Sequence, residues 1–209
     1  FSIYWCYTRL VVTWKIMTVY NALRYNNSYA NVGNLILLST QTASADASLS
    51  FTSGINSTYK EYVFIYNNFH PASDNQKLTF QASIDSGSNY NVALTSTRFY
   101  ALGGEAGSTT LEYDASEDQA NGTAFQNVNA GTGNGNDESS SGILRIFEPS
   151  STTFVKHFMI TTESYHGADL ALNAYTAGYF NTTSAIDAIQ FKTTSGNIDA
   201  GVIQMFGVI

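Results

Sequence analysis

Apolar and polar residues alternate with a period of two in short runs from about residue 35 to the C-terminus, and this alternation constrains the fold more than any other feature. In "KLTFQASI" every second residue is apolar and is predicted to point inward: Leu78, Phe80, Ala82 and Ile84. The intervening Thr79, Gln81 and Ser83 are predicted to face outward. Turn clusters rich in Gly, Asn, Asp and Ser separate these runs at short intervals, a spacing typical of sandwiches and barrels.

The pattern predicts an all-β fold: an antiparallel β-sandwich, jelly-roll-like, with long polar loops and at most one short helix. The predicted strands cover residues 59–66, 77–84, 90–100, 143–148, 153–162, 185–192 and 201–208. The predicted core contains Phe64, Leu78, Phe80, Ile84, Ile146, Phe158, Ile189, Phe191, Ile203 and Met205.

Three stretches carry more specific expectations about local structure. Residues 59–102 are predicted to form a three-stranded meander, because two turn clusters separate three alternating runs. Residues 103–142 are polar and dense in Gly and Asn, so we expect surface loops with up to two short strands. The stretch "HGADLALNAYTAGYF" is the only one with helical character, and it predicts a short helix or an irregular crossover.

The C-terminus is predicted to end in a core strand. "AIDAIQFKTT" and "AGVIQMFGVI" are the last two predicted strands, and "SGNID" joins them. Ile203 and Met205 are expected to place an apolar face opposite Ile189 and Phe191. Hydrogen bonds of the sheet are therefore expected to hold the end of the chain in place.

The chain is predicted to divide into residues 1–34, an N-terminal arm or partly non-native leader, and residues 35–209, a single β-sandwich domain. The first stretch starts at Phe1 and is apolar and aromatic, but it carries Arg9 and Lys15, so it fits neither a membrane span nor a signal peptide. If Met17 is the true start, residues 1–16 are a remnant of upstream sequence. Otherwise the arm adds a strand to the domain or docks on a neighbouring subunit.

Composition excludes several classes of partner. The formal net charge is −7 and the sequence pI is about 4.7, whereas nucleic-acid surfaces need clustered Lys and Arg. We therefore expect no nucleic acid and no membrane as partners. Cys6 is the only cysteine, so no intrachain disulfide can form and packing must stabilise the fold.

No pattern in the sequence indicates catalysis, so we predict no enzymatic activity, no catalytic residues, no cofactor and no catalytic metal. His157 and His166 lack zinc-ligand spacing, and His70 lies in a loop near Asp74 that is either a ligand pair or an ordinary turn. A GxSxG elbow is also absent from the sequence. The carboxylates Asp85, Asp114, Glu117 and Asp118 are predicted to be turn and surface residues.

Calcium is left open for one loop. "NAGTGNGNDE", residues 129–138, has the oxygen-rich side chains and glycines that can wrap a hard cation, although it lacks the EF-hand order. The alternative is a flexible solvated loop.

Three segments, "EYVFIYNNFHPASDNQKLTFQASIDSGSNYNV", "PSSTTFVKHFMITT" and "GYFNTTSAIDAIQFKTTSGNIDAGVIQMFGV", resemble proteins of marine bacteriophages. In those phages similar segments occur in virion-associated structural or tail-fibre-like proteins. The resemblance runs from about Leu35 to the C-terminus, and its most specific block is "AIDAIQFKTTSGNIDAGVIQMFG". It implies a jelly-roll-like sandwich located on the virion, and it carries no catalytic residues.

These observations predict a non-enzymatic virion structural protein, either a capsid decoration or a tail component. The alternative is a carbohydrate-binding module for host-surface glycans, because the same architecture serves lectins. Exposed Tyr or Trp residues along a concave face would favour that alternative, and Tyr62 and Tyr66 could serve there or in the core. Partners are expected to be copies of the chain and other virion proteins, held largely through the basic, aromatic arm.

Overall fold

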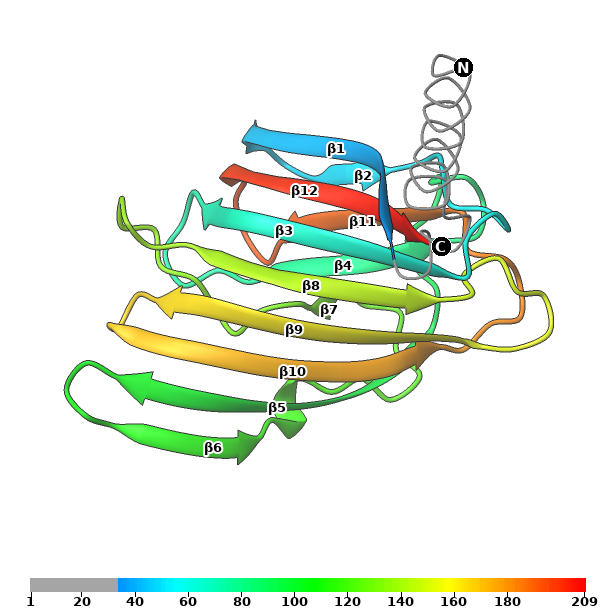
Figure 1. Ribbon diagram of the computed structural model, residues 1–209. Helices are drawn as coiled ribbons and strands as arrows, with labels where there is room; N and C mark the ends of the chain where they lie inside the picture. The colour runs from blue at the N-terminus through cyan, green and yellow to red at the C-terminus, as the bar shows by residue number, and fades with distance from the viewer. Residues whose placement is uncertain (1–33) are drawn as a thin grey trace, which may run out of the picture. The chain divides into compact units, whose positions relative to one another are not determined.

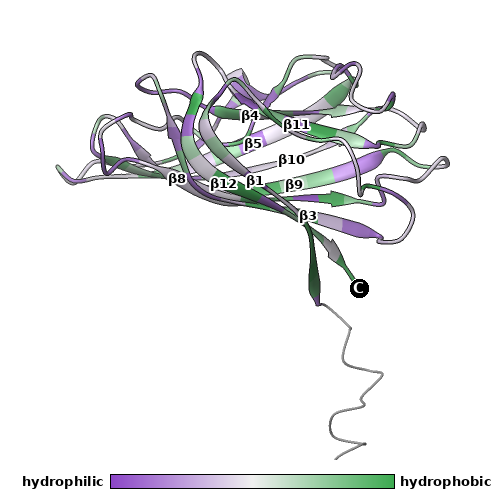
Figure 2. Ribbon diagram, turned by 90° about the horizontal axis from the view of Figure 1, so that it is seen from above, coloured by the Kyte–Doolittle hydropathy of each residue, from purple (hydrophilic) through white to green (hydrophobic). Residues whose placement is uncertain are grey.

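The computed structural model describes residues 34–209, and within it Leu35–Val208 form one compact unit of two antiparallel sheets. The larger sheet has eight strands in the order β1-β12-β3-β8-β9-β10-β5-β6, and the smaller has the order β2-β11-β4-β7. Figure 1 shows the eight-stranded layer, and Figure 2 shows β4 and β11 in a second layer above it. The predicted all-β sandwich is thus confirmed, and its jelly-roll connectivity stays a prediction.

Residues 34–209 hold twelve strands and one 3₁₀ helix, bounded as follows: β1 (Leu35–Asp46), β2 (Leu49–Phe51), β3 (Glu61–Pro71), β4 (Leu78–Ser83), β5 (Leu94–Gly104), β6 (Thr109–Tyr113), η1 (Ala115–Glu117), β7 (Gln126–Asn127), β8 (Ser140–Phe147), β9 (Lys156–His166), β10 (Leu170–Phe180), β11 (Ala188–Thr193) and β12 (Ile198–Val208). The polar middle of the chain holds β6, η1 and β7, so the expectation of loops with two short strands is confirmed.

The core lies between the two layers and is built around phenylalanine rings. The ring of Phe80 on β4 packs edge-on against Phe158 of β9 and Phe180 of β10, with centroids 5.3 and 5.9 Å away. Phe191 on β11 makes similar contacts with the rings of Phe51 and Phe64. Period-two alternation sends these rings into the same layer, because successive side chains of a strand point to opposite faces. Nine of the ten predicted core residues are buried.

Ile84 is the exception, because 43% of its surface is exposed. β4 ends one residue earlier, at Ser83. The Ser83 hydroxyl accepts hydrogen bonds from the backbone N–H groups of Asp85 and Gly87 and turns the chain away from the sheet. The predicted strand 77–84 is therefore one residue too long at its C-terminal end.

The prediction that Thr79, Gln81 and Ser83 face solvent is also wrong, since all three residues are buried. The loop before β7 covers this side. The Gln81 side-chain amide donates hydrogen bonds to the carbonyl oxygens of Thr123 and Ala124, at 3.1 and 3.0 Å. Gln81 therefore binds the long loop rather than water, while the Thr79 hydroxyl donates a hydrogen bond to the Lys192 carbonyl of β11.

The predicted meander over residues 59–102 is wrong, because its three strands do not pair with one another. β3 lies between β12 and β8, β4 pairs with β11 and β7 in the other sheet, and β5 pairs with β10 and β6. The last two strands are likewise split between the sheets, and both contribute buried side chains to the core. Alternation shows which side of a strand is buried, but it does not select the strand's neighbour.

The short helix or irregular crossover predicted for residues 166–180 is a strand instead, β10. β10 pairs over its whole length with β9 on one side and β5 on the other. Alanine-rich segments favour helix by local propensity, but pairing on both sides satisfies the backbone and overrides that preference. β12 pairs with β1 and β3, so the prediction that ladder bonds hold the last strand is confirmed.

Candidate functional site

A row of exposed aromatic side chains crosses the outer face of the larger sheet. Tyr175 on β10, Phe99 on β5 and Tyr113 on β6 are direct cross-strand neighbours, and we call them the aromatic row. Their exposed fractions are 41%, 47% and 58%. The rings of Phe99 and Tyr175 stack with centroids 5.1 Å apart and planes 12° from parallel. The fold therefore positions large apolar rings in solvent, side by side.

A groove of about 470 Å³ lies next to the aromatic row on the same face. The imidazole of His157 and the ring of Tyr179 meet edge-on at its side, with centroids 6.3 Å apart. Met159 is an exposed part of its lining. Gly178 lines the groove beside Phe158, and a Cβ added there would lie 2.3 Å from the Thr95 carbonyl oxygen, so its neighbours would have to shift. The groove is mostly apolar, with Thr95 and Thr97 hydroxyls at its side.

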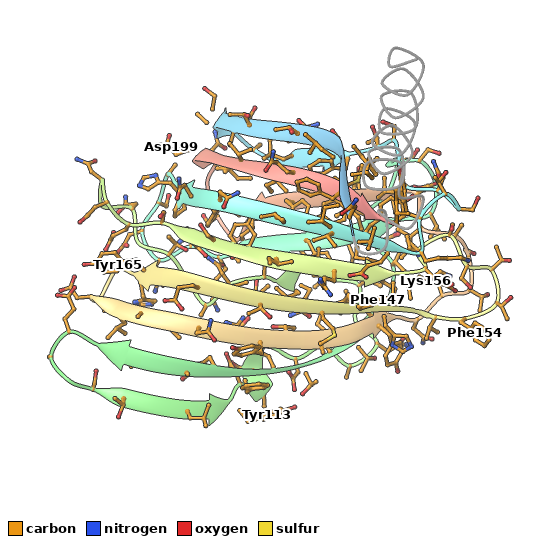
Figure 3. The ribbon with its side chains drawn as sticks, viewed as in Figure 1. Tyr113, Phe147, Phe154, Lys156, Tyr165 and Asp199 are labelled. Atoms are coloured by element: carbon orange, nitrogen blue, oxygen red, sulfur yellow. The ribbon has the colours of Figure 1, made fainter. Side chains whose placement is uncertain are left out.

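The aromatic row ends at β6, the last strand of the larger sheet, beside which residues 34–209 supply no further strand (Figure 1). All five residues of β6 are exposed, and 76% of the surface of Leu111, at the centre of the strand, is in contact with solvent. Figure 3 shows Tyr113 at this margin of the molecule. Leu111 and Tyr113 point to the same face of β6, because they are two residues apart in a strand. Leu111 therefore extends the exposed apolar patch of the aromatic row, and contiguous patches of this kind mark surfaces that bind other molecules.

A cluster of charged side chains lies around the buried Arg98 and links the β5–β6 hairpin to the segment that follows it. Arg98 of β5 is fully buried, and its guanidinium lies 3.7 Å from the carboxylate of Asp114 and 3.9 Å from that of Glu117. Lys77 and Asn127 both donate hydrogen bonds to the Glu117 carboxylate. Glu117 and Asp114 were predicted to be turn and surface residues. The prediction is wrong for Glu117, because only 10% of its side chain is exposed and its carboxylate neutralises the buried guanidinium of Arg98.

Burial and charge act in opposite directions on the pKa values of this cluster. Burial lowers the pKa of Arg98, and the neighbouring carboxylates of Glu117 and Asp114 partly restore it. Burial raises the pKa of Glu117, but the hydrogen bonds from Lys77 and Asn127 and the nearby positive charges outweigh it. The pKa of Glu117 is therefore lowered overall, which favours the charged form of its carboxylate.

A second hollow, of about 620 Å³, collects carboxylates at one end of the larger sheet. We call it the acidic hollow; its lining includes Glu105, Asp137, Glu163 and Asp169 around Tyr165. The Tyr165 hydroxyl lies 3.3 Å from Asp169, and the charge of Glu105 is the main cause that raises its pKa. Burial raises the pKa of Glu163. Figure 3 shows Tyr165 and Asp199 at this same end.

The histidines do not come together into a site. His70 contacts the Gly135 carbonyl at 3.1 Å and lies 3.6 Å from Asp199, not Asp74. His157 lies on the outer face, and His166 accepts a hydrogen bond from the Ala168 backbone. Among residues 34–209, no group of three or more His, Cys, Asp or Glu side chains is arranged to hold a metal ion.

The loop considered for calcium is tied into the fold by Asn129. Its side-chain oxygen accepts a hydrogen bond from the backbone of Leu78, its amide donates to Thr132, and its carbonyl oxygen accepts one from Arg98. Asn129 and Thr132 are buried. The first part of the loop is therefore committed to structural contacts, in place of the flexible loop that the sequence suggested.

Sequence reasoning missed the aromatic row for an identifiable reason. Tyr175 and Tyr179 fall in the stretch predicted as a helix, so their shared face with Phe99 was not apparent. Tyr62 and Tyr66, the two tyrosines considered for sugar stacking, are buried core residues. The Tyr66 hydroxyl bonds to Ser140 at 3.0 Å, and burial raises its pKa.

The sequence matches no protein-family model and no curated protein. Within the part of the chain that the structure describes, no helix is both long and apolar enough to cross a membrane. The surfaces of the sandwich are therefore the basis for assigning a function.

Proposed function

We propose that the chain is a non-enzymatic structural protein of a marine bacteriophage virion, either a capsid decoration or a tail component. The resemblance of its strand segments to virion proteins supports this role. The protein acts by contact: its β-sandwich presents surfaces to neighbouring virion proteins and to further copies of itself. The basic arm, residues 1–34, remains a predicted docking element, and it lies almost entirely outside the described residues.

The observation that carries the proposal is the aromatic row. Monomeric proteins seldom expose several large apolar side chains together, and such patches mark surfaces that bind other molecules. The stacked pair Phe99 and Tyr175 already uses one face of each ring for an internal contact, which leaves ring edges and outer faces for a partner. Protein interfaces are enriched in such Tyr and Phe side chains.

Two measurements test the proposal. Quantitative mass spectrometry of purified particles from a phage that encodes this chain should find it in stoichiometric amounts, and its absence from the particles would contradict a virion role. The double variant Phe99→Ser and Tyr175→Ser should weaken self-association in solution, measured by light scattering. Phe154→Ser is the matched control, because Phe154 is an exposed ring outside the row. Equal masses in solution for the unmodified protein, the double variant and Phe154→Ser would rule out the aromatic row as the contact surface.

A second candidate function, binding of host-surface glycans, is favoured by the groove beside the row. Aromatic and apolar side chains can cover a sugar ring, while the hydroxyls of Thr95, Thr97 and Tyr179 can bond to sugar hydroxyls. In affinity electrophoresis, host-surface polysaccharide should retard the protein, and Tyr179→Ala should abolish the retardation while Phe154→Ala leaves it unchanged. Identical mobility with and without polysaccharide would remove this candidate.

A further inference from the structure

The backbone of β6 carries an unpaired hydrogen-bonding edge whose pattern can be worked out from its pairing with β5. The N–H of Asp114 donates to the carbonyl of Arg98 at 3.0 Å, and the N–H of Gly104 donates to that of Ser108 at 2.8 Å. In an antiparallel pair, alternate residues bond to the same neighbour. Ser108, Thr110, Glu112 and Asp114 therefore point their backbone groups toward β5.

The other residues of the strand point their backbone groups away from the sheet. Thr109, Leu111 and Tyr113 each present an N–H and a C=O at the free edge, where the described residues supply no further strand. Proteins usually protect such edges with Pro, Lys or a bulge, because an open edge pairs with other chains. The stretch "TTLEY" has no Pro and no Lys, and its register with β5 shows no bulge. Glu112 is its only charged residue.

We propose that two copies of the chain associate by pairing β6 with β6 in antiparallel register, around a two-fold axis at Leu111. In this register Leu111 faces Leu111 of the second copy, and Thr109 faces Tyr113. Each of these pairs joins residues whose backbone groups both point outward, so each exchanges two hydrogen bonds. The two larger sheets become one continuous sheet, and the interface is isologous.

Side chains on both faces fit this register. On the outer face, the two Leu111 side chains lie opposite each other and shield apolar surface that the single chain leaves in water. On the other face, Glu112 lies opposite Thr110 of the second copy, so the two glutamates do not face each other directly. The Glu112 carboxylate also accepts a hydrogen bond from Tyr100 of its own chain at 3.0 Å, which holds it toward β5.

This inference deepens the proposed function, since it assigns one surface for the self-association proposed there. The two can fail separately. An oligomer held by the arm or by the aromatic row would leave the proposed function intact and would not involve the edge of β6.

Disulfide trapping tests the register directly, in a Cys6→Ser background so that the introduced thiol is the only one. Leu111→Cys should give a disulfide-linked dimer under mild oxidation, because residues in such a pair lie about 5.5 Å apart by Cα and a disulfide spans roughly 4.4–6.8 Å. Thr109→Cys is the matched control. Its copy lies four residues along the strand, about 14 Å away, so it should stay monomeric on the same gel.

Leu111→Pro gives an independent measurement of mass in solution. Proline removes an N–H that makes no bond within the single chain, so the domain should keep its far-UV circular dichroism while the dimer is lost. Trapping of Leu111→Cys but not Thr109→Cys, together with a halved mass for Leu111→Pro, supports the proposal. Failure of Leu111→Cys to crosslink, equal crosslinking of both cysteines, or an unchanged mass for Leu111→Pro would overturn it.

Discussion

Replacing Phe80 with alanine tests the packing argument most directly. Phe80 is fully buried, and its ring contacts those of Phe158, Phe180 and Phe191 from three different strands. Phe→Ala in a core costs about 3–5 kcal/mol of unfolding free energy, through lost transfer energy and the cavity left behind. Favourable aromatic pairs add about 0.5–1.5 kcal/mol each, and two of the three contacts are edge-on. We therefore expect a value near the top of the range, about 5 kcal/mol.

Urea unfolding followed by far-UV circular dichroism measures this change. Far-UV circular dichroism follows the strands of the sandwich themselves, whereas both tryptophans, Trp5 and Trp14, belong to residues 1–34. Thermal unfolding gives a second measure of the same loss. A domain of this size loses roughly 2–4 °C of melting temperature per kcal/mol, so the melting temperature of Phe80→Ala should fall by about 10–20 °C.

The control for this experiment is Phe154→Ala, because Phe154 is a mostly exposed ring. Surface substitutions usually change the free energy of unfolding by less than about 0.5 kcal/mol. If Phe80→Ala cost less than about 1 kcal/mol, the reasoning that places this ring at the centre of the core would be refuted.

Three further predictions follow from particular contacts. Gly178→Ala should cost about 1–3 kcal/mol of unfolding free energy, because an added Cβ would lie 2.3 Å from the Thr95 carbonyl oxygen and 2.6 Å from the Phe158 ring. Gly103→Ala, which meets nothing within 4 Å, should be near neutral in the same denaturation assay. The pKa of Glu117 is lowered in the folded state, so its contribution to stability is complete above its usual pKa of 4.5 and is lost as pH falls through the folded-state value. Glu117→Gln should flatten that acid arm of a melting-temperature profile, and an unchanged profile would contradict the ion cluster. For the 129–138 loop, the melting temperature should be the same in excess calcium as in the presence of a chelator. A higher melting temperature in calcium would indicate a bound ion.

The sequence alone predicted much of the local structure and little of the pairing. Alternation in "KLTFQASI" was sufficient to place Phe80 in the core, because side-chain direction in a strand depends only on its period of two. It did not show that β4 leaves the sheet of β3, since that choice depends on which distant strand offers a matching edge. It also failed for Ile84, where the Ser83 hydroxyl ends the strand.

The surfaces were decided by the tertiary structure. Tyr175 is far from Phe99 and Tyr113 in the chain, and only the order β10-β5-β6 makes the three neighbours. Glu117 resembled any polar loop carboxylate until the fold buried Arg98 beside it. Leu111 was one apolar residue in a polar stretch, and its exposure follows from the position of β6 at the end of a sheet. Local pattern determines which residues can be buried, whereas partner, edge and charge environment arise only when distant segments meet.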